Sequence, residues 1–121
     1  MAVLTEGTHT GEFLISEANG YRSRDTIVVL TGEVLNAGTI IGKVTASGKY
    51  VRYDPVASNG SETVAGIVFG NIDATDADAN AVIISRDSEV NNELLTYSDG
   101  ADASAITTAN TELEALGIIV R

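Results

Sequence analysis

The stretch GTIIGKVTASGKYVRYD, Gly38–Asp54, contains the pattern that decides the fold. Its two halves, residues 38–45 and 49–54, are rich in β-branched and aromatic residues, which suit a pleated sheet. Between them lies the loop Ala46–Gly48, and a three-residue loop that contains glycine is typical of a β-hairpin. The stretch therefore predicts two neighbouring antiparallel strands.

On both sides of this hairpin the chain repeats the same kind of short apolar run. The runs are separated by segments rich in Asn, Asp and Gly, such as residues 55–62 and 73–80, which favour turns. Apolar runs bounded in this way are typical of strands. Four further strands are therefore predicted: Thr26–Leu30, Thr63–Phe69, Ala81–Arg86 and Glu93–Tyr97.

One segment, Ser104–Leu116, has the period of an amphipathic helix. Asp102 or Ser104 can cap its start, and Gly117 can end it in a left-handed conformation. The last apolar residues, Ile118–Val120, predict a short strand that pairs back onto the sheet. We therefore expect an α+β fold, mostly β, with one short helix near the C-terminus. The apolar side chains that share one face of this helix are Ile106, Ala109, Leu113 and Leu116.

The N-terminal residues differ in composition from the rest of the chain. Residues 1–11 are rich in Thr and Gly, with few large apolar groups that could offset the entropy cost of ordering the backbone. We interpret them as a flexible arm that continues into the apolar run Phe13–Ile15, and an ordinary frayed terminus is the alternative. No basic start and apolar signal region precede this segment, so we expect synthesis in the cytoplasm.

Composition excludes many kinds of chemistry. The 121 residues include no Cys and one His, which excludes disulfides, thiolate nucleophiles and thiolate metal sites. Seventeen acidic residues against seven basic ones give a net charge of −10. Such a charge repels the phosphates of nucleic acids and anionic lipids, so we expect neither a nucleic-acid partner nor a membrane partner.

The remaining candidate sites have simpler explanations. Asp76, Asp78 and Asn80 are spaced as in a calcium loop, but Ala81 stands where the loop needs Gly, and a solvated acidic loop explains them better. His9 lies in the expected arm, where no neighbours would hold it as a general base. We therefore expect no catalytic residue, no metal site and no cofactor.

Several segments together resemble a known family, the head decoration proteins of tailed bacteriophages of the phage lambda protein D type. They occur in the same order along nearly the whole chain. The segments that carry the resemblance are Gly11–Asp25 (GEFLISEANGYRSRD), Ala37–Val44, Tyr53–Pro55, Ala65–Val68 and Glu114–Val120.

The resemblance implies a fold and an assembly. It implies a homotrimer whose subunits each have a compact β-tulip core, residues 25–121, and an extended N-terminal arm, residues 1–24. The trimers would bind the major capsid (coat) protein on the outer surface of the expanded head, at three-fold and quasi-three-fold positions. There they would hold neighbouring coat subunits together against the pressure of the packaged DNA.

The resemblance also assigns the coat contacts to the arm. Within it we expect Phe13 and Ile15 to point to one side of an extended strand and to anchor it in a coat groove. Arg22 and Arg24 could pair with coat carboxylates or be solvated. The expected capsid-contact residues are Thr10, Glu12, Phe13, Leu14, Ile15, Tyr21, Arg22 and Arg24.

Three other functions remain open from the sequence. A phage tail or baseplate component would also be acidic, β-rich and oligomeric. A small soluble module that binds sugars or peptides would have a similar composition. An enzyme domain remains open because the fold could bring two carboxylates together.

Overall fold

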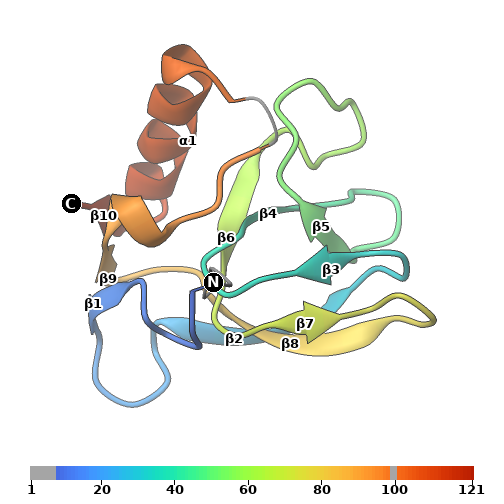
Figure 1. The fold of residues 1–121 in the computed structure, drawn as a ribbon, viewed down its shortest axis with the longest axis horizontal. Coiled ribbons are helices and arrows are strands. Elements are labelled where there is room, and N and C mark those ends of the chain that lie inside the picture. Colours follow the sequence, from blue (N-terminus) through green and yellow to red (C-terminus); the bar gives the residue numbers. More distant parts are fainter. Residues whose placement is uncertain (1–7, 99–100) are drawn as a thin grey trace, which may run out of the picture.

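The computed structural model describes residues 8–98 and 101–121. Five strands form a closed barrel in the order β2-β5-β4-β6-β8 (Figure 1). The predicted hairpin is confirmed, because β4 and β5 pair antiparallel, with Ile41 opposite Arg52. A parallel pairing of Val29 with Tyr50 closes the barrel. The barrel strands are β2 (Arg24–Val29), β4 (Ile40–Lys43), β5 (Tyr50–Arg52), β6 (Val64–Val68) and β8 (Ala79–Ile84).

A separate three-stranded sheet lies at one end of the barrel. It consists of β1 (Leu14–Glu17), β9 (Ser88–Val90) and β10 (Ile118–Val120), with β9 in the middle. The predicted final strand is confirmed, and it pairs parallel to β9. We call this part of the molecule the sheet end and define it as residues 14–25, 85–90 and 118–121; it lies on the left of Figure 1.

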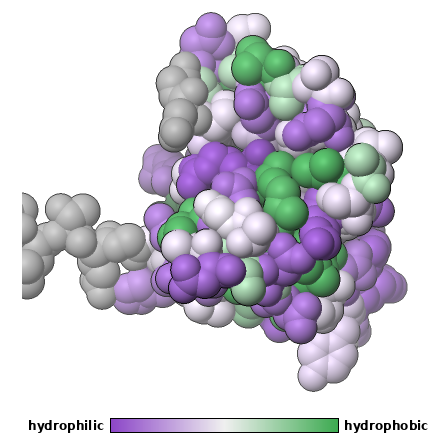
Figure 2. Space-filling model, turned by 90° about the vertical axis from the view of Figure 1, so that its right-hand side faces the viewer, coloured by the Kyte–Doolittle hydropathy of each residue, from purple (hydrophilic) through white to green (hydrophobic). Residues whose placement is uncertain are grey.

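The opposite part of the molecule consists mainly of connections between strands. It contains the short pair β3 (Val34–Leu35) and β7 (Ile72–Asp73). We call it the loop end and define it as residues 30–34, 43–62 and 72–78. Figure 2 looks onto this side, where apolar patches lie between many hydrophilic residues.

The helix forms where the apolar period predicts it. Helix α1 spans Ala103–Ala115, and the side chain of Asp102 accepts a hydrogen bond from the backbone N–H of Ala105 at 2.9 Å, which caps the start. Gly117 follows with φ 88°, in the left-handed region that favours glycine after a helix. No helix in the described ranges is long and apolar enough to span a membrane.

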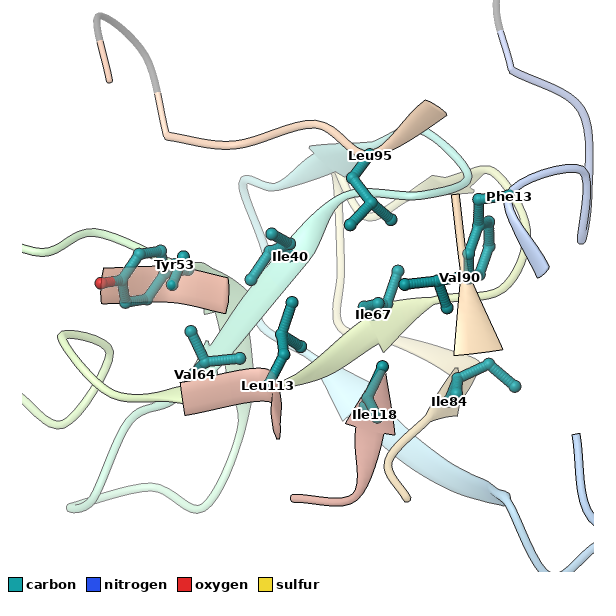
Figure 3. Packing of buried hydrophobic residues seen from close by; sticks show 11 residues of the cluster. Phe13, Ile40, Tyr53, Val64, Ile67, Ile84, Val90, Leu95, Leu113 and Ile118 are labelled. Carbon is teal, nitrogen blue, oxygen red and sulfur yellow. The ribbon is translucent and has the colours of Figure 1, made fainter. Parts of the chain in front are cut away.

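Two apolar clusters form the core. One fills the barrel around Val29, Ile41 and Ile83. The other joins the barrel to the helix and the three-stranded sheet, and Figure 3 shows Leu113 and Ile118 lying against Ile67 of β6. The fold is therefore mostly β with one helix near the C-terminus, as predicted.

The predicted strand at Glu93–Tyr97 is wrong. The chain instead forms a 3₁₀ turn, η1 (Asn92–Leu94), because the side chain of Asn91 accepts a hydrogen bond from the N–H of Glu93 at 3.0 Å and caps it. Of the predicted strand, Thr96 makes an isolated bridge to Thr39.

Residues 8–24 differ from the expected arm. Phe13 belongs to the core cluster and β1 pairs with β9, so this segment packs on the body of the isolated chain. The composition of the segment, which is rich in small and polar residues, did not indicate this packing. The burial of one aromatic ring, Phe13, and the pairing of β1 with β9 place the segment on the body of the protein. The part of the expected arm that precedes residue 8 lies outside the described residues.

Candidate interaction face

Strand β1 lies at the edge of its sheet, so one row of its backbone groups faces away from β9. Its pairing with β9 is interrupted by a bulge between Leu14, opposite Val90, and Ser16, opposite Glu89. The extra residue is Ile15, whose side chain is 53% exposed. Leu14 is half-buried and Ser16 is exposed, so strict alternation of the two faces fails at the bulge.

Phe13 is not available as a coat anchor in this structure. Its side chain is fully buried, with Val90, Leu95 and Ile118 in the same cluster, and its carbonyl oxygen accepts a hydrogen bond from the N–H of Asn91 at 2.8 Å. Exposing this ring would remove a large apolar group from the core. The expectation that Phe13 and Ile15 point to the same side is therefore corrected: Phe13 faces inward and Ile15 faces solvent.

A tight turn leads the chain into β1. The N–H of Gly11 donates to the carbonyl of Phe69 at 2.9 Å, and the side chain of Glu12 accepts from the N–H of His9 at 2.8 Å. Gly11 has φ 69°, and a Cβ there would lie 2.9 Å from the Phe69 ring. Thr10 is exposed at the start of this turn. Thr10 and Glu12 therefore lie beside the barrel, on a turn whose geometry requires glycine.

The loop between β1 and β2 exposes Tyr21 above a hydrogen-bonded serine. Tyr21 is 82% exposed. Beneath it Ser23 is fully buried, and its hydroxyl accepts from the N–H of Ala18 at 2.9 Å and donates to the carbonyl of Asp87 at 2.8 Å. Arg22 forms an ion pair with Asp87 at 3.4 Å. The exposed aromatic side chain therefore lies on a loop that is tied to Asp87, the residue before β9.

Arg24 joins this loop to the barrel. Its guanidinium donates two hydrogen bonds to Glu17, at 2.9 and 2.6 Å, and lies 4.2 Å from the centre of the Phe69 ring. The hydrogen bond from Arg24 lowers the pKa of the Glu17 carboxyl below its usual value. The guanidinium of Arg24 is thus already paired with Glu17 and packed on Phe69 within the chain.

Asp25 is held in a similar way. It accepts hydrogen bonds from the hydroxyl of Ser85 at 2.7 Å and from the guanidinium of Arg86. The Ser85 hydrogen bond, followed by Arg86, lowers the pKa of Asp25. Arg86 also donates to the carbonyl of Arg22 at 2.7 Å, which ties this pair to the Tyr21 loop.

The C-terminal strand contributes a second exposed apolar residue to the same face. Ile119 is 38% exposed and lies opposite Glu89 in β9, which in turn lies opposite Ser16 in β1. Partners in register point to the same side of a sheet, so these three side chains form a row across its outer face. A hollow of about 300 Å³ on this face is lined by Ser16, Arg22, Asp87 and Ile119, among others.

Reasoning from the sequence missed Ile119, Arg86 and Asp87. The signal for Ile119 was available, because a three-residue strand whose first residue is buried exposes the second. Arg86 and Asp87 have no local signal in the sequence, since their position beside residues 22–25 depends on the antiparallel pairing of β2 with β8.

Charge is distributed unequally between the two ends. The sheet end carries four arginines and four carboxylates, and all are joined in pairs: Arg22–Asp87, Arg24–Glu17, Arg86–Asp25 and Arg121–Glu89. The loop end carries three basic residues and six carboxylates, and its described ion pair is Lys49–Asp78. The sheet end is therefore neutral, and the loop end bears three net negative charges.

A hollow of about 710 Å³ borders the loop end. It lies between the loop at residues 54–61 and the start of α1, and its lining includes Glu33, Arg52 and Asp102. Asp102 caps the helix and Glu33 accepts a hydrogen bond from the N–H of Arg52, so both carboxylates already have partners within the chain.

The suspected calcium loop does not form a metal site. Its Asp78 accepts hydrogen bonds from the side chain of Lys49 and from the N–H of Thr31. Among residues 8–98 and 101–121, no three acidic or histidine side chains gather where a metal ion could bind.

These features describe a small structural β-protein that presents an edge strand and exposed apolar side chains on a neutral face. A family model described as bacteriophage lambda head decoration protein D matches residues 3–118 of the 121. The chain belongs to this family of structural capsid proteins and is a capsid decoration protein, a component of the phage virion. A search of the curated proteins gave no match.

Proposed function

We propose that the protein binds as a homotrimer to the major capsid protein on the outer surface of the expanded phage head, at three-fold and quasi-three-fold positions. The observation that carries this proposal is the family match over residues 3–118, since that family decorates phage heads. The protein would be made in the host cytoplasm and would join the shell after expansion. It would act as a cementing protein that resists the pressure of the packaged DNA.

The stabilisation follows from mass action. A protein that binds the intact shell and not its separated subunits shifts the equilibrium towards the intact shell. Three identical binding segments on one trimer would raise the effective concentration of each and turn weak individual contacts into firm attachment.

Strand β1 supports a binding mode for the proposed contact. An extended coat segment would add to the unpaired edge of β1, where backbone hydrogen bonds supply affinity and neighbouring side chains supply register. Of the expected contact residues, Ile15 and Tyr21 are the most exposed apolar side chains. We therefore assign them the anchoring role and keep Thr10, Glu12, Leu14 and Arg22 as further proposed contacts, while Arg24 holds the segment in place through Glu17.

The experiment uses the full chain, because deleting residues 1–20 would remove Phe13 from the core. Sedimentation of the purified protein at micromolar concentration measures its oligomeric state. The protein is then mixed separately with empty expanded heads, with DNA-filled heads and with isolated tails, all lacking it. The copies bound per particle are counted, and the temperature at which the filled heads release DNA is measured. We expect a trimer that saturates the shell and raises the temperature at which filled heads release DNA. A monomer that leaves the heads bare would refute the proposal, and attachment to tails alone would indicate a tail component.

A further inference from the structure

The chain contains two Asn-Gly pairs, Asn19 with Gly20 and Asn59 with Gly60, and their surroundings in the structure differ. We propose that Asn19 is a site of spontaneous deamidation in the folded protein, and that the fold protects Asn59 from the same reaction. The modification is a covalent change in the chain itself, so it goes beyond the proposed function and does not depend on it.

The chemistry needs only the chain and water. An asparagine before glycine is open to attack by the next backbone nitrogen, because glycine has no Cβ that hinders the approach. The nitrogen of Gly20 would bond to Cγ of Asn19 and lose its proton to solvent. The Cγ–Nδ2 bond breaks, and the amide nitrogen takes a proton and leaves as ammonia. Water then opens the succinimide ring at Cγ to give aspartate, or at the backbone carbonyl to give isoaspartate.

Asn19 and Gly20 are both exposed, in the loop between β1 and β2 at the lower left of Figure 1. The N–H of Ala18 donates to the hydroxyl of Ser23 at 2.9 Å, but among the described residues neither the Asn19 side chain nor the N–H of Gly20 has a hydrogen-bond partner. An added Cβ on Gly20 would meet no atom within 4 Å, so space for the ring is open. An exposed side chain of this kind changes rotamer in picoseconds to nanoseconds and samples the attack geometry freely.

Asn59 and Gly60 are held by hydrogen bonds on both reacting groups. The Oδ1 atom of Asn59 accepts from the N–H of Ser61 at 3.1 Å and from its hydroxyl at 2.6 Å. The N–H of Gly60, the attacking group, donates to the carboxylate of Glu62 at 2.8 Å. The backbone is fixed as well, because the carbonyl of Asn59 accepts from the N–H of Thr45 at 2.9 Å.

These bonds raise the barrier to ring closure at Asn59. The side chain must first turn away from Ser61, and the nitrogen of Gly60 must lose the proton that it donates to Glu62. A carboxylate that accepts this proton stabilises the N–H form and repels the anion formed when the proton leaves. The same pair of residue types therefore reacts at different rates because of the fold around it.

Deamidation of Asn19 would change the sheet end in two ways. Replacing an amide by a carboxylate adds one negative charge to a part of the molecule whose charges otherwise balance. The isoaspartate form also inserts a methylene group into the main chain beside Ala18, whose N–H belongs to the hydrogen bonds of this loop. Aged protein would therefore contain forms that differ in charge and in loop geometry.

The test compares the two sites within one molecule. Full-length protein is incubated in mildly alkaline buffer, folded or unfolded in urea, and digested with trypsin at intervals. The peptides of residues 1–22 and 53–86 separate the sites, fragment masses locate the converted asparagine, and isoaspartate methyltransferase labels the isoaspartate. In the folded protein we expect Asn19 to react about tenfold or more faster than Asn59. In urea the two rates should be similar, because glycine follows both asparagines.

Variants check the cause of the difference, and circular dichroism confirms that each is folded. Asn19→Gln should stop the reaction in residues 1–22, because the longer side chain closes its ring far more slowly. Glu62→Ala and Ser61→Ala should each speed the reaction of Asn59 and leave that of Asn19 unchanged.

The proposal is overturned if the two sites react at equal rates in folded wild-type protein, or if Asn59 reacts faster. It is also overturned if Asn19 stays unmodified in the folded protein while the unfolded chain reacts there. If Glu62→Ala and Ser61→Ala are folded and no faster at Asn59, the hydrogen bonds do not protect this site.

Discussion

The sheet end and the loop end of this molecule differ in charge: the charged side chains of the sheet end balance, whereas the loop end has an excess of carboxylates. At the sheet end, four arginines lie within hydrogen-bonding or ion-pairing distance of four carboxylates that come from distant parts of the sequence. At the loop end, six carboxylates face three basic residues. A net charge of −10 therefore describes the chain as a whole but not each surface, and a strongly acidic protein can still present a neutral face to a partner.

The two ends also differ in how they join the core. The sheet end contributes Val90 and Ile118 to the apolar cluster under α1, with Phe13 beside them. The loop end contributes Tyr53 to the same cluster and Ala74 to the barrel cluster, and it is joined to the barrel through β5. We therefore expect substitutions that loosen the sheet end to affect stability and binding together.

The largest expected effect is that of Phe13→Ala, which removes a fully buried ring from the base of the sheet end. The loss of the ring and the cavity left behind should lower the free energy of unfolding by about 3–5 kcal/mol. Urea denaturation followed by circular dichroism measures this change. The control is Ile15→Ala, two residues further on, which should change stability by roughly 0.5 kcal/mol or less because its side chain faces solvent. Equal effects would mean that the N-terminal segment does not pack as described.

A smaller effect is expected at Gly11, where the chain turns into β1. Gly11→Ala would force an L side chain into a positive φ and place its Cβ 2.9 Å from the Phe69 ring. The cost should be about 1–3 kcal/mol, and hydrogen exchange should show less protection of β1 than of the barrel. The control is Gly20→Ala, which also has a positive φ but no atom within 4 Å of the added Cβ. A Gly11 variant no less stable than the Gly20 variant would contradict the close approach to Phe69.

The ion pairs of the two ends should differ in strength. Arg24 makes two hydrogen bonds to Glu17 and lies over an aromatic ring, whereas Lys49 reaches Asp78 as a single point contact at the surface. Arg24→Ala should therefore destabilise by about 1–2 kcal/mol, and Lys49→Ala by less than about 1 kcal/mol. Thermal unfolding at low and high salt measures both. If both variants lost the same free energy of unfolding, the two-hydrogen-bond pair of Arg24 would be no stronger than the single contact of Lys49, against the prediction.

The smallest expected effect is a change in pH dependence. The folded chain lowers the pKa of Glu17, so this carboxylate stabilises the fold above the usual glutamate pKa of about 4.3, and its contribution is lost as the pH falls through the lowered value. Glu17→Gln should therefore flatten the fall in unfolding free energy below about pH 4.3. Urea titrations at several acidic pH values measure it, with Glu114→Gln on the exposed side of α1 as the control. An unchanged slope in Glu17→Gln would contradict the role of the Arg24 hydrogen bonds.

The sequence predicted the parts of the fold whose signals are local. Runs of Val and Ile bounded by turn residues became β2, β4, β6 and β8, and the apolar stripe that ends at Gly117 became α1. Strand β9 has the sequence Ser-Glu-Val, which carries no period, and it forms because β1 and β10 pair with it on both sides.

The candidate site could be predicted only in part, for the same reason. Tyr21 and Ile15 were recognisable as apolar residues in a polar segment. The inward direction of Phe13 was not, because the bulge after it depends on the register with β9. The neutralisation of Arg22 and Arg24 was likewise hidden, because their partners are fixed by tertiary pairing rather than by neighbouring sequence.

The most direct test of the central claim is a cryo-electron microscopy map of expanded heads decorated with the wild-type protein. We predict density for trimers of the protein on the outer surface, at three-fold and quasi-three-fold positions, with β1 and Tyr21 in contact with the coat protein. A map without density for the protein on the outer surface, or one in which β1 and Tyr21 face solvent, would contradict the account.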